Sequence, residues 1–168
     1  MLISEDYRLQ NAALHRLGRF GGSGHKHAAA VRAFAREIDA QTILDYGCGQ
    51  GTLSKALPEY MVSEYDPAIE ALSADPDPAE LVVCADVMEH VEPECLDAVL
   101  DHIASKARKG VYFAIALRMD SKKLLPDGRN PHLIVESAQW WREVIGAVFD
   151  VRGWQEIRGK ELILRVVP

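Results

Sequence analysis

Residues 44–57 have the sequence LDYGCGQGTLSKAL, and this stretch decides the fold. A short apolar run ends in Asp45, glycines follow at alternate positions 47, 49 and 51, and a helical pattern begins directly after them. Glycine in such a turn costs conformational entropy, so the backbone there must approach something closely. A Gly-rich turn into a helix also presents unpaired N–H groups that hold anionic or polar ligand groups. The stretch therefore predicts a strand, a ligand-binding turn and a helix.

The spacing of these glycines narrows the kind of ligand. A phosphate-binding loop needs GxxxxGK followed by Ser or Thr, and a dinucleotide site needs GxGxxG, whereas the sixth position here is Thr52. A second acid, Asp66, follows Asp45 by 21 positions at the end of the next apolar run. An acid at about that distance can accept both hydroxyls of a ribose. We therefore expect a nucleoside ligand with a polar tail.

Apolar runs alternate with helical patterns along the rest of the chain, which predicts a mostly parallel sheet covered on both faces. The predicted strands are 42–47, 60–66, 81–86, 111–117, and a closing hairpin of 151–157 and 161–167. The predicted helices are 4–17 with Ser4 as cap, one from residue 28, 52–57, one from Pro93 up to Gly110, and one capped by Ser137. Ligands in such sheets bind at the carboxyl ends of the strands.

Composition favours one domain, 1–168, with an N-terminal helix and Gly-rich loop at 1–27 and a core at 28–168. The net charge of −6 favours a small-molecule partner over nucleic acid. No apolar run reaches about 18 residues, and the acidic start lacks a signal-peptide pattern, so no membrane association is expected. Cys48, Cys84 and Cys95 show no CxxC spacing and indicate reduced thiols in a cytoplasmic protein. We expect a monomer or a homodimer.

Three segments together resemble the class I S-adenosylmethionine-dependent methyltransferases. They are LDYGCGQG at 44–51, SEYDPA at 63–68, and CADVMEHVEP at 84–93, which is similar to the DVLEHV segment of small single-domain members. They occur in family order, and the resemblance covers roughly residues 28–167. It implies a Rossmann-like three-layer α/β/α fold, a C-terminal antiparallel hairpin strand, and S-adenosyl-L-methionine as cofactor.

The resemblance also implies roles for single residues. The glycines would let the backbone approach the methionine part of the cofactor, Asp66 would bind the ribose, and Tyr65 and Pro67 would flank the adenine. The full set expected around the cofactor is Asp45, Tyr46, Gly47, Cys48, Gly49, Gly51, Tyr65, Asp66, Pro67, Asp86, Val87 and Met88. Glu89 and His90 would start the segment that faces the acceptor.

The sequence departs from the family after Asp66. Only 14 residues separate Asp66 from Leu81, where a helix and a third strand normally lie. We therefore expect the third strand to be missing or vestigial. That region usually supplies a group that recognises the adenine ring, so adenine recognition is expected to differ here.

The long polar segment 118–136 is expected to lie over the acceptor, because a loop of this length in a compact domain is more often functional than idle. Asp127, Arg129 and Asn130, together with His25, are the expected acceptor contacts. Where a general base is needed, His132 is the first candidate and His90 the second. Tyr7, His15 and segment 21–27 are the alternative acceptor surface.

The local spacing predicts no metal site, since His25 and His27 have no further ligand at a recognisable distance. Two other functions remain open. One is an inactive cofactor-binding subunit that serves a partner chain, and the other is a lyase or hydrolase that consumes S-adenosylmethionine without an acceptor. The acceptor itself does not follow from fold and cofactor.

Overall fold

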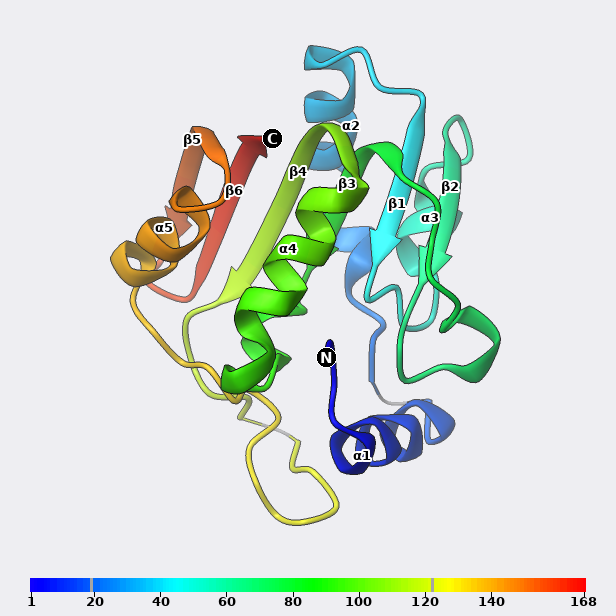
Figure 1. The fold of residues 1–168 in the computed structure, drawn as a ribbon, viewed down its shortest axis with the longest axis vertical. Coiled ribbons are helices and arrows are strands. Elements are labelled where there is room, and N and C mark those ends of the chain that lie inside the picture. Colours follow the sequence, from blue (N-terminus) through cyan, green and yellow to red (C-terminus); the bar gives the residue numbers. More distant parts are fainter. Residues whose placement is uncertain (19, 122) are drawn as a thin grey trace.

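A computed structural model describes residues 1–18, 20–121 and 123–168. Its centre is one six-stranded sheet in the order β2-β1-β3-β4-β6-β5 (Figure 1). The strands are β1 (Thr42–Tyr46), β2 (Met61–Tyr65), β3 (Ala79–Ala85), β4 (Ala107–Ala116), β5 (Asp150–Ile157) and β6 (Glu161–Val167). The first four are parallel, and β6 inserts antiparallel between β4 and β5. The predicted Rossmann-like sheet with a closing antiparallel hairpin is confirmed.

Helices cover both faces of this sheet. On one face, α4 (Leu96–Lys106) and α5 (Ala138–Gly146) bury Leu100, Ile103 and Trp141 against the sheet. On the other face, α2 (Ala28–Glu37) and α3 (Thr52–Ala56) bury Phe34 and Leu53. The central strands β1, β3 and β4 are buried on both sides, which is why they lack alternation in the sequence.

Between β2 and β3 the described chain forms only a short 3₁₀ turn, η2 (Glu70–Leu72), and no strand. The expected loss of the third strand is confirmed. As a result β2 is an edge strand, and the chain crosses directly from β2 to β3 on the far side of β1.

One predicted boundary is wrong. The basic residues before Gly110 predicted a helix through Lys109, but α4 ends at Lys106 and β4 begins at Ala107. Pairing with β3 explains the difference, because Ala107 lies opposite Ala79 and Gly110 opposite Leu81. The strand partner outweighs the helical pattern of the last turn.

The N-terminal helix α1 (Glu5–Arg16) lies beyond the carboxyl ends of β1 and β2 and packs outside the two helical layers (Figure 1). Ser4 caps it as predicted, since its Oγ accepts a hydrogen bond from the Tyr7 N–H. The Ser4 N–H and O–H also donate to the carboxylate of Glu92, at 2.7 Å and 2.6 Å. Glu92 lies just before η4 (Pro93–Cys95), so this pair ties the helix to the sheet domain.

No helix in the described parts of the chain is both long enough and apolar enough to span a bilayer. The three cysteines are free and buried.

We expect Glu92→Ala to detach α1, because a buried carboxylate that accepts two hydrogen bonds contributes about 1–3 kcal/mol. Hydrogen exchange across residues 1–17 should speed up, and the melting temperature should fall. Glu94→Ala is the matched control, since Glu94 is exposed two residues further on. Equal exchange in the two variants would show that Glu92 does not hold the helix.

Candidate functional site

The turn after β1 forces the backbone into the left-handed region at Gly47 and Gly49, with φ of +78° and +52°. A side chain at Gly47 would lie 2.4 Å from a methyl of Val87, which follows β3. A side chain at Gly49 would lie 2.6 Å from the backbone of Gly21 in the N-terminal loop. Glycine is therefore required here by packing within the chain as well as by backbone conformation.

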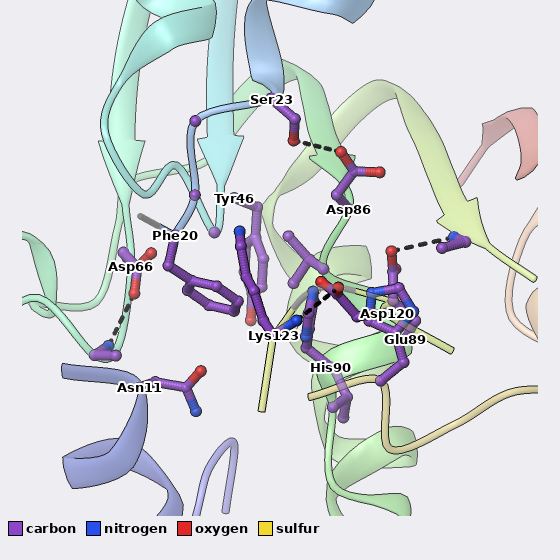
Figure 2. Close-up of a pocket in the computed structure, with 18 of the residues that line it drawn as sticks. Asn11, Phe20, Ser23, Tyr46, Asp66, Asp86, Glu89, His90, Asp120 and Lys123 are labelled. Atoms are coloured by element: carbon purple, nitrogen blue, oxygen red, sulfur yellow. Dashed lines mark hydrogen bonds between the residues drawn. The ribbon is translucent and has the colours of Figure 1, made fainter. Parts of the chain in front are cut away.

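The N-terminal loop is fixed to this turn by backbone hydrogen bonds. The Gln50 N–H donates to the Gly21 carbonyl at 2.9 Å, and the Gln50 side chain donates to the Phe20 carbonyl at 2.8 Å. The Gly-rich segment predicted as a loop therefore forms one wall of the site and brings Phe20 over the strand ends (Figure 2).

A cavity of about 960 Å³ opens between the N-terminal segment, the carboxyl ends of β1 to β4, and segment 118–132. Nine residues predicted for the cofactor site and the segment facing the acceptor line it. They are Tyr46, Gly47, Asp66, Pro67, Asp86, Val87, Glu89, His90 and His132. The strand ends meet at one edge of the sheet, which explains why residues so far apart in sequence share one cavity.

Asp66 is held at the end of β2 with its carboxylate directed into the cavity wall (Figure 2). Its two oxygens accept from the N–H groups of Gly49 at 3.1 Å and Ala68 at 2.9 Å. His15 of α1 approaches one of these oxygens at 3.6 Å. Burial nevertheless lowers the pKa of His15, outweighing the attraction of Asp66.

Six residues predicted to touch the cofactor are not among those lining the cavity, namely Asp45, Cys48, Gly49, Gly51, Tyr65 and Met88. Tyr65 instead packs against Tyr46, with ring centroids 4.9 Å apart, and Met88 is fully buried in the core. Burial raises the pKa of the Cys48 thiol, so that cysteine is neutral. These residues form the layer behind the cavity wall.

Asp45 belongs to this rear layer and is 5% exposed. Burial first, and then the nearby charges of Glu64 and Asp66, raise the pKa of Asp45 to about 7. Because the pKa of this carboxyl is higher in the folded than in the unfolded chain, the folded protein loses stability as the pH rises toward neutrality.

At the end of β3, Asp86 turns into the left-handed region with φ +56° and accepts a hydrogen bond from the Ser23 hydroxyl (Figure 2). His27 lies 3.8 Å from Asp86 and 4.0 Å from Glu161. Burial acts to raise the pKa of Asp86, but hydrogen bonds from His27 and Ser23 outweigh it and lower that pKa.

The histidine that reaches the cavity from the N-terminal loop is His27, and not the predicted His25. His25 is exposed, and its backbone N–H donates to the Thr52 hydroxyl at 3.2 Å. The 3₁₀ turn η1 (Gly24–His27) turns these two residues to opposite sides.

A second group of polar residues lies on the 3₁₀ turn η3 (Met88–His90) and the segment facing it. Glu89 is 1% exposed, and its Oε1 accepts from the Ala116 N–H at 3.1 Å. His90 donates from Nδ1 to the Pro131 carbonyl at 2.8 Å, and its ring lies 4.8 Å from that of His132 at 87°. Burial raises the pKa of Glu89 well above its usual range and lowers the pKa of His90 to about 4.

Asp127, Arg129 and Asn130, predicted as acceptor contacts, do not line the cavity. Asp127 and Arg129 pair with each other on the surface, at 2.7 Å between the guanidinium and the carboxylate. Asn130 orders the segment instead, since its side chain bonds the backbone of Asp120 and of His132. These side chains therefore make their contacts within and beside the DGRN turn, outside the cavity.

Several cavity residues had no sequence motif to identify them, and they include Phe20, Ser23, His27 and Lys123. The ring of Phe20 lies 5.2 Å from the rings of both His15 and His90, and Lys123 lies 5.2 Å above it (Figure 2). The predicted alternative acceptor surface also reaches the cavity, and its lining residues are Tyr7, His15, Gly21, Gly22, Ser23, Lys26 and His27. The only sequence signal for this wall was the glycine content of 18–24.

Comparison with known proteins assigns a family. Residues 23–157 match the sequence model of a methyltransferase domain. The fold resembles 1,6-didemethyltoxoflavin-N1-methyltransferase from Burkholderia thailandensis, bound to S-adenosylhomocysteine, with TM-score 0.69, 15% identity, and coverage of 95% of this chain and 86% of that one. It also resembles DhpI bound to S-adenosylhomocysteine, with TM-score 0.67, 17% identity, and coverage of 99% and 98%.

A third similar structure is magnesium protoporphyrin IX methyltransferase from Synechocystis PCC 6803, with TM-score 0.60, 18% identity, and coverage of 85% of this chain and 82% of that one. No curated protein sequence matches the chain.

We expect Gly49→Ala to destabilise the protein more than Gly159→Ala. Both residues have positive φ, which costs about 1–2 kcal/mol for an L side chain. Only Gly49 adds a collision with the Gly21 backbone, whereas Gly159 has one ordinary contact at 3.7 Å. Thermal unfolding and hydrogen exchange at 18–24 would measure the difference. Identical melting temperatures would disprove the packing constraint.

Proposed function

The chain belongs to the methyltransferase-domain family and is an S-adenosylmethionine-dependent class I methyltransferase, and we propose that its acceptor is a small molecule bound in the cavity. One observation carries the proposal. A buried carboxylate, Asp66, and a pair of imidazoles, His90 and His132, line one cavity large enough for a cofactor and an acceptor together.

The residues present fit the cofactor. A carboxylate has about four lone-pair positions, and backbone N–H groups occupy only two of those on Asp66. The remaining two can accept the hydroxyls of a ribose. We propose that Asp66 holds the ribose, that Pro67 lies beside the adenine, and that the backbone of Gly47 and the side of Val87 face the methionine part.

We propose that the acceptor binds at the side of the cavity opposite Asp66, beside His90 and His132. When bound, the cofactor supplies a methyl group on a sulfonium, whose carbon–sulfur bond breaks with its electrons remaining on sulfur as the acceptor atom bonds to carbon. The protein must hold the acceptor in line and exclude water. Tyr7, His15 and Phe20 of the N-terminal segment cover the cavity and serve that purpose.

The two imidazoles are the groups that we assign to the reacting atom of the acceptor. Each donates from Nδ1 to a backbone carbonyl, His90 to Pro131 and His132 to Arg118, so each keeps a free lone pair on Nε2. Such a lone pair can take a proton or bind a metal ion. The low pKa of His90, about 4, makes it a weak base, so we assign the proton-accepting role to His132.

A small acceptor is supported by charge as well as by the cavity. The net charge of −6 disfavours a polyanion. The toxoflavin-precursor and magnesium-protoporphyrin methyltransferases similar in fold carry small acceptors in their names. The three free, buried cysteines further support a reducing compartment, the cytoplasm.

Asp66→Ala should weaken cofactor binding at least tenfold, because two hydrogen bonds to a charged group contribute roughly 1.5–3 kcal/mol each. Calorimetry with S-adenosylhomocysteine measures the effect. Asp66 also accepts from two backbone N–H groups. Asp66→Asn keeps one acceptor oxygen, so it should weaken binding while lowering the melting temperature less than Asp66→Ala does. Asp77→Ala, at an exposed position, is the control. Unchanged affinity in both Asp66 variants would disprove the ribose assignment.

Methyl transfer itself is tested by incubating the protein with labelled S-adenosylmethionine and a panel of small acceptors that offer hydroxyl, amine or thiol groups. We expect S-adenosylhomocysteine to form only when a suitable acceptor is present. Cofactor loss without any acceptor would indicate a lyase or hydrolase. Tight binding with no turnover on any acceptor, together with a stable complex with a second chain, would indicate a partner subunit.

A further inference from the structure

Glu89, His90 and His132 form a cluster at the acceptor side of the cavity. One donor atom of each residue lies within 4.8 Å of the donor atoms of the other two. His90 and His132 are 42 positions apart and are brought together by the segment after β4, whose Leu133 and Ile134 N–H groups donate to the Glu89 carbonyl at 2.7 Å and 3.1 Å. The main chain therefore fixes the spacing of the cluster.

Both imidazoles are oriented as metal ligands usually are. His90 donates from Nδ1 to the Pro131 carbonyl, and His132 donates from Nδ1 to the Arg118 carbonyl. A second-shell carbonyl of this kind fixes the tautomer, turns the ring and leaves the Nε2 lone pair for an ion. Two rings at 87° to each other present these lone pairs from different directions.

The carboxylate of Glu89 supplies an independent observation. Its side chain is 99% removed from solvent, and Oε2 has no hydrogen-bond partner among the described residues. A buried polar oxygen without a partner is costly and rare in native proteins. A cation at this position would satisfy the oxygen that the protein itself leaves unpaired.

We propose that Glu89, His90 and His132 bind one divalent transition-metal ion beside the acceptor. Two histidines and one carboxylate are a common ligand set for such ions, and three protein ligands leave coordination positions open for a further group. An ion there supplies Lewis acidity toward an acceptor oxygen or nitrogen. That catalytic use rests on the proposed function, whereas binding of the ion does not.

With the ion bound, the Nε2 lone pairs of both histidines are committed to it. The role of His132 would then change from general base to ligand. The ion would lower the pKa of a bound acceptor hydroxyl or amine, whose proton would pass to solvent before methyl transfer. The expectation of no metal site, which rested on the spacing of His25 and His27, is replaced by a site that those residues do not enter.

A second cluster, His27, Asp86 and Glu161, also has donor atoms within 4.8 Å of one another. Asp86 accepts a hydrogen bond from Ser23, and His27 lies 3.8 Å from Asp86 and 4.0 Å from Glu161. The hydroxyl of Tyr112 lies 3.4 Å from Nδ1 of the same histidine. This cluster therefore lacks the unpaired buried atom that distinguishes Glu89, and it serves as an internal comparison.

The test is titration of the chelator-treated full chain with Zn²⁺ by calorimetry, and with Co²⁺ by visible absorption, in the absence of cofactor. We expect one ion per chain and a Co²⁺ spectrum with nitrogen and oxygen ligands. Glu89→Gln and His132→Ala should each weaken binding by at least about tenfold, the scale seen even for outer-shell partners of metal ligands. His25→Ala and His27→Gln should bind Zn²⁺ like the unchanged chain.

Glu89→Gln keeps the oxygen that accepts from Ala116, and His132 is only half-buried, so both variants are expected to remain folded, as melting curves would verify. The absence of one-to-one binding would overturn the proposal and leave Glu89 as a neutral buried acid. Loss of binding in His27→Gln alone would also overturn it and place the ion in the second cluster. Affinity for S-adenosylhomocysteine, measured on the same samples, tests the proposed function separately.

Discussion

The site depends on the left-handed turn after β1, where the backbone has no room for side chains at 47 and 49. Gly47 and Cys48 donate their N–H groups to the Tyr65 carbonyl at 2.7 Å and 3.1 Å, and Gly49 donates to Asp66. In the same turn, the Gln50 N–H donates to the carbonyl of Gly21 in the N-terminal loop. One short segment thus joins β1, the end of β2 and the cover of the cavity, and a larger residue in it would separate all three.

Much of the fold could be predicted from the sequence because its signals are local. Alternating apolar runs and helical patterns specify the strands and helices, and the 14 residues after Asp66 are too few for another helix and strand. The end of α4 could not be predicted in this way. Arg108 and Lys109 suit a helix terminus, but β3 offers them a pairing edge that only the tertiary structure provides.

The site was predictable where a motif and a strand end coincide, as at Asp66 and Asp86. Contacts made by loops were predictable only in part, because they depend on which way a turn directs each side chain. His25 and His27 differ by two positions, yet only His27 lies at the cavity. Likewise the DGRN turn satisfies its own polar groups, while His132, just beyond it, reaches His90.

Electrostatics gives these placements a common reason. The cavity edge gathers the acids Asp66, Asp86 and Glu89, with Asp45 behind them, in a chain that already carries six excess negative charges. Burying acids so close together costs stability, as the raised pKa values of Asp45 and Glu89 indicate. A sulfonium is a cation, and so is a divalent metal ion. Both would be attracted to this edge, and each would offset the repulsion that the acids exert on one another when the cavity is empty.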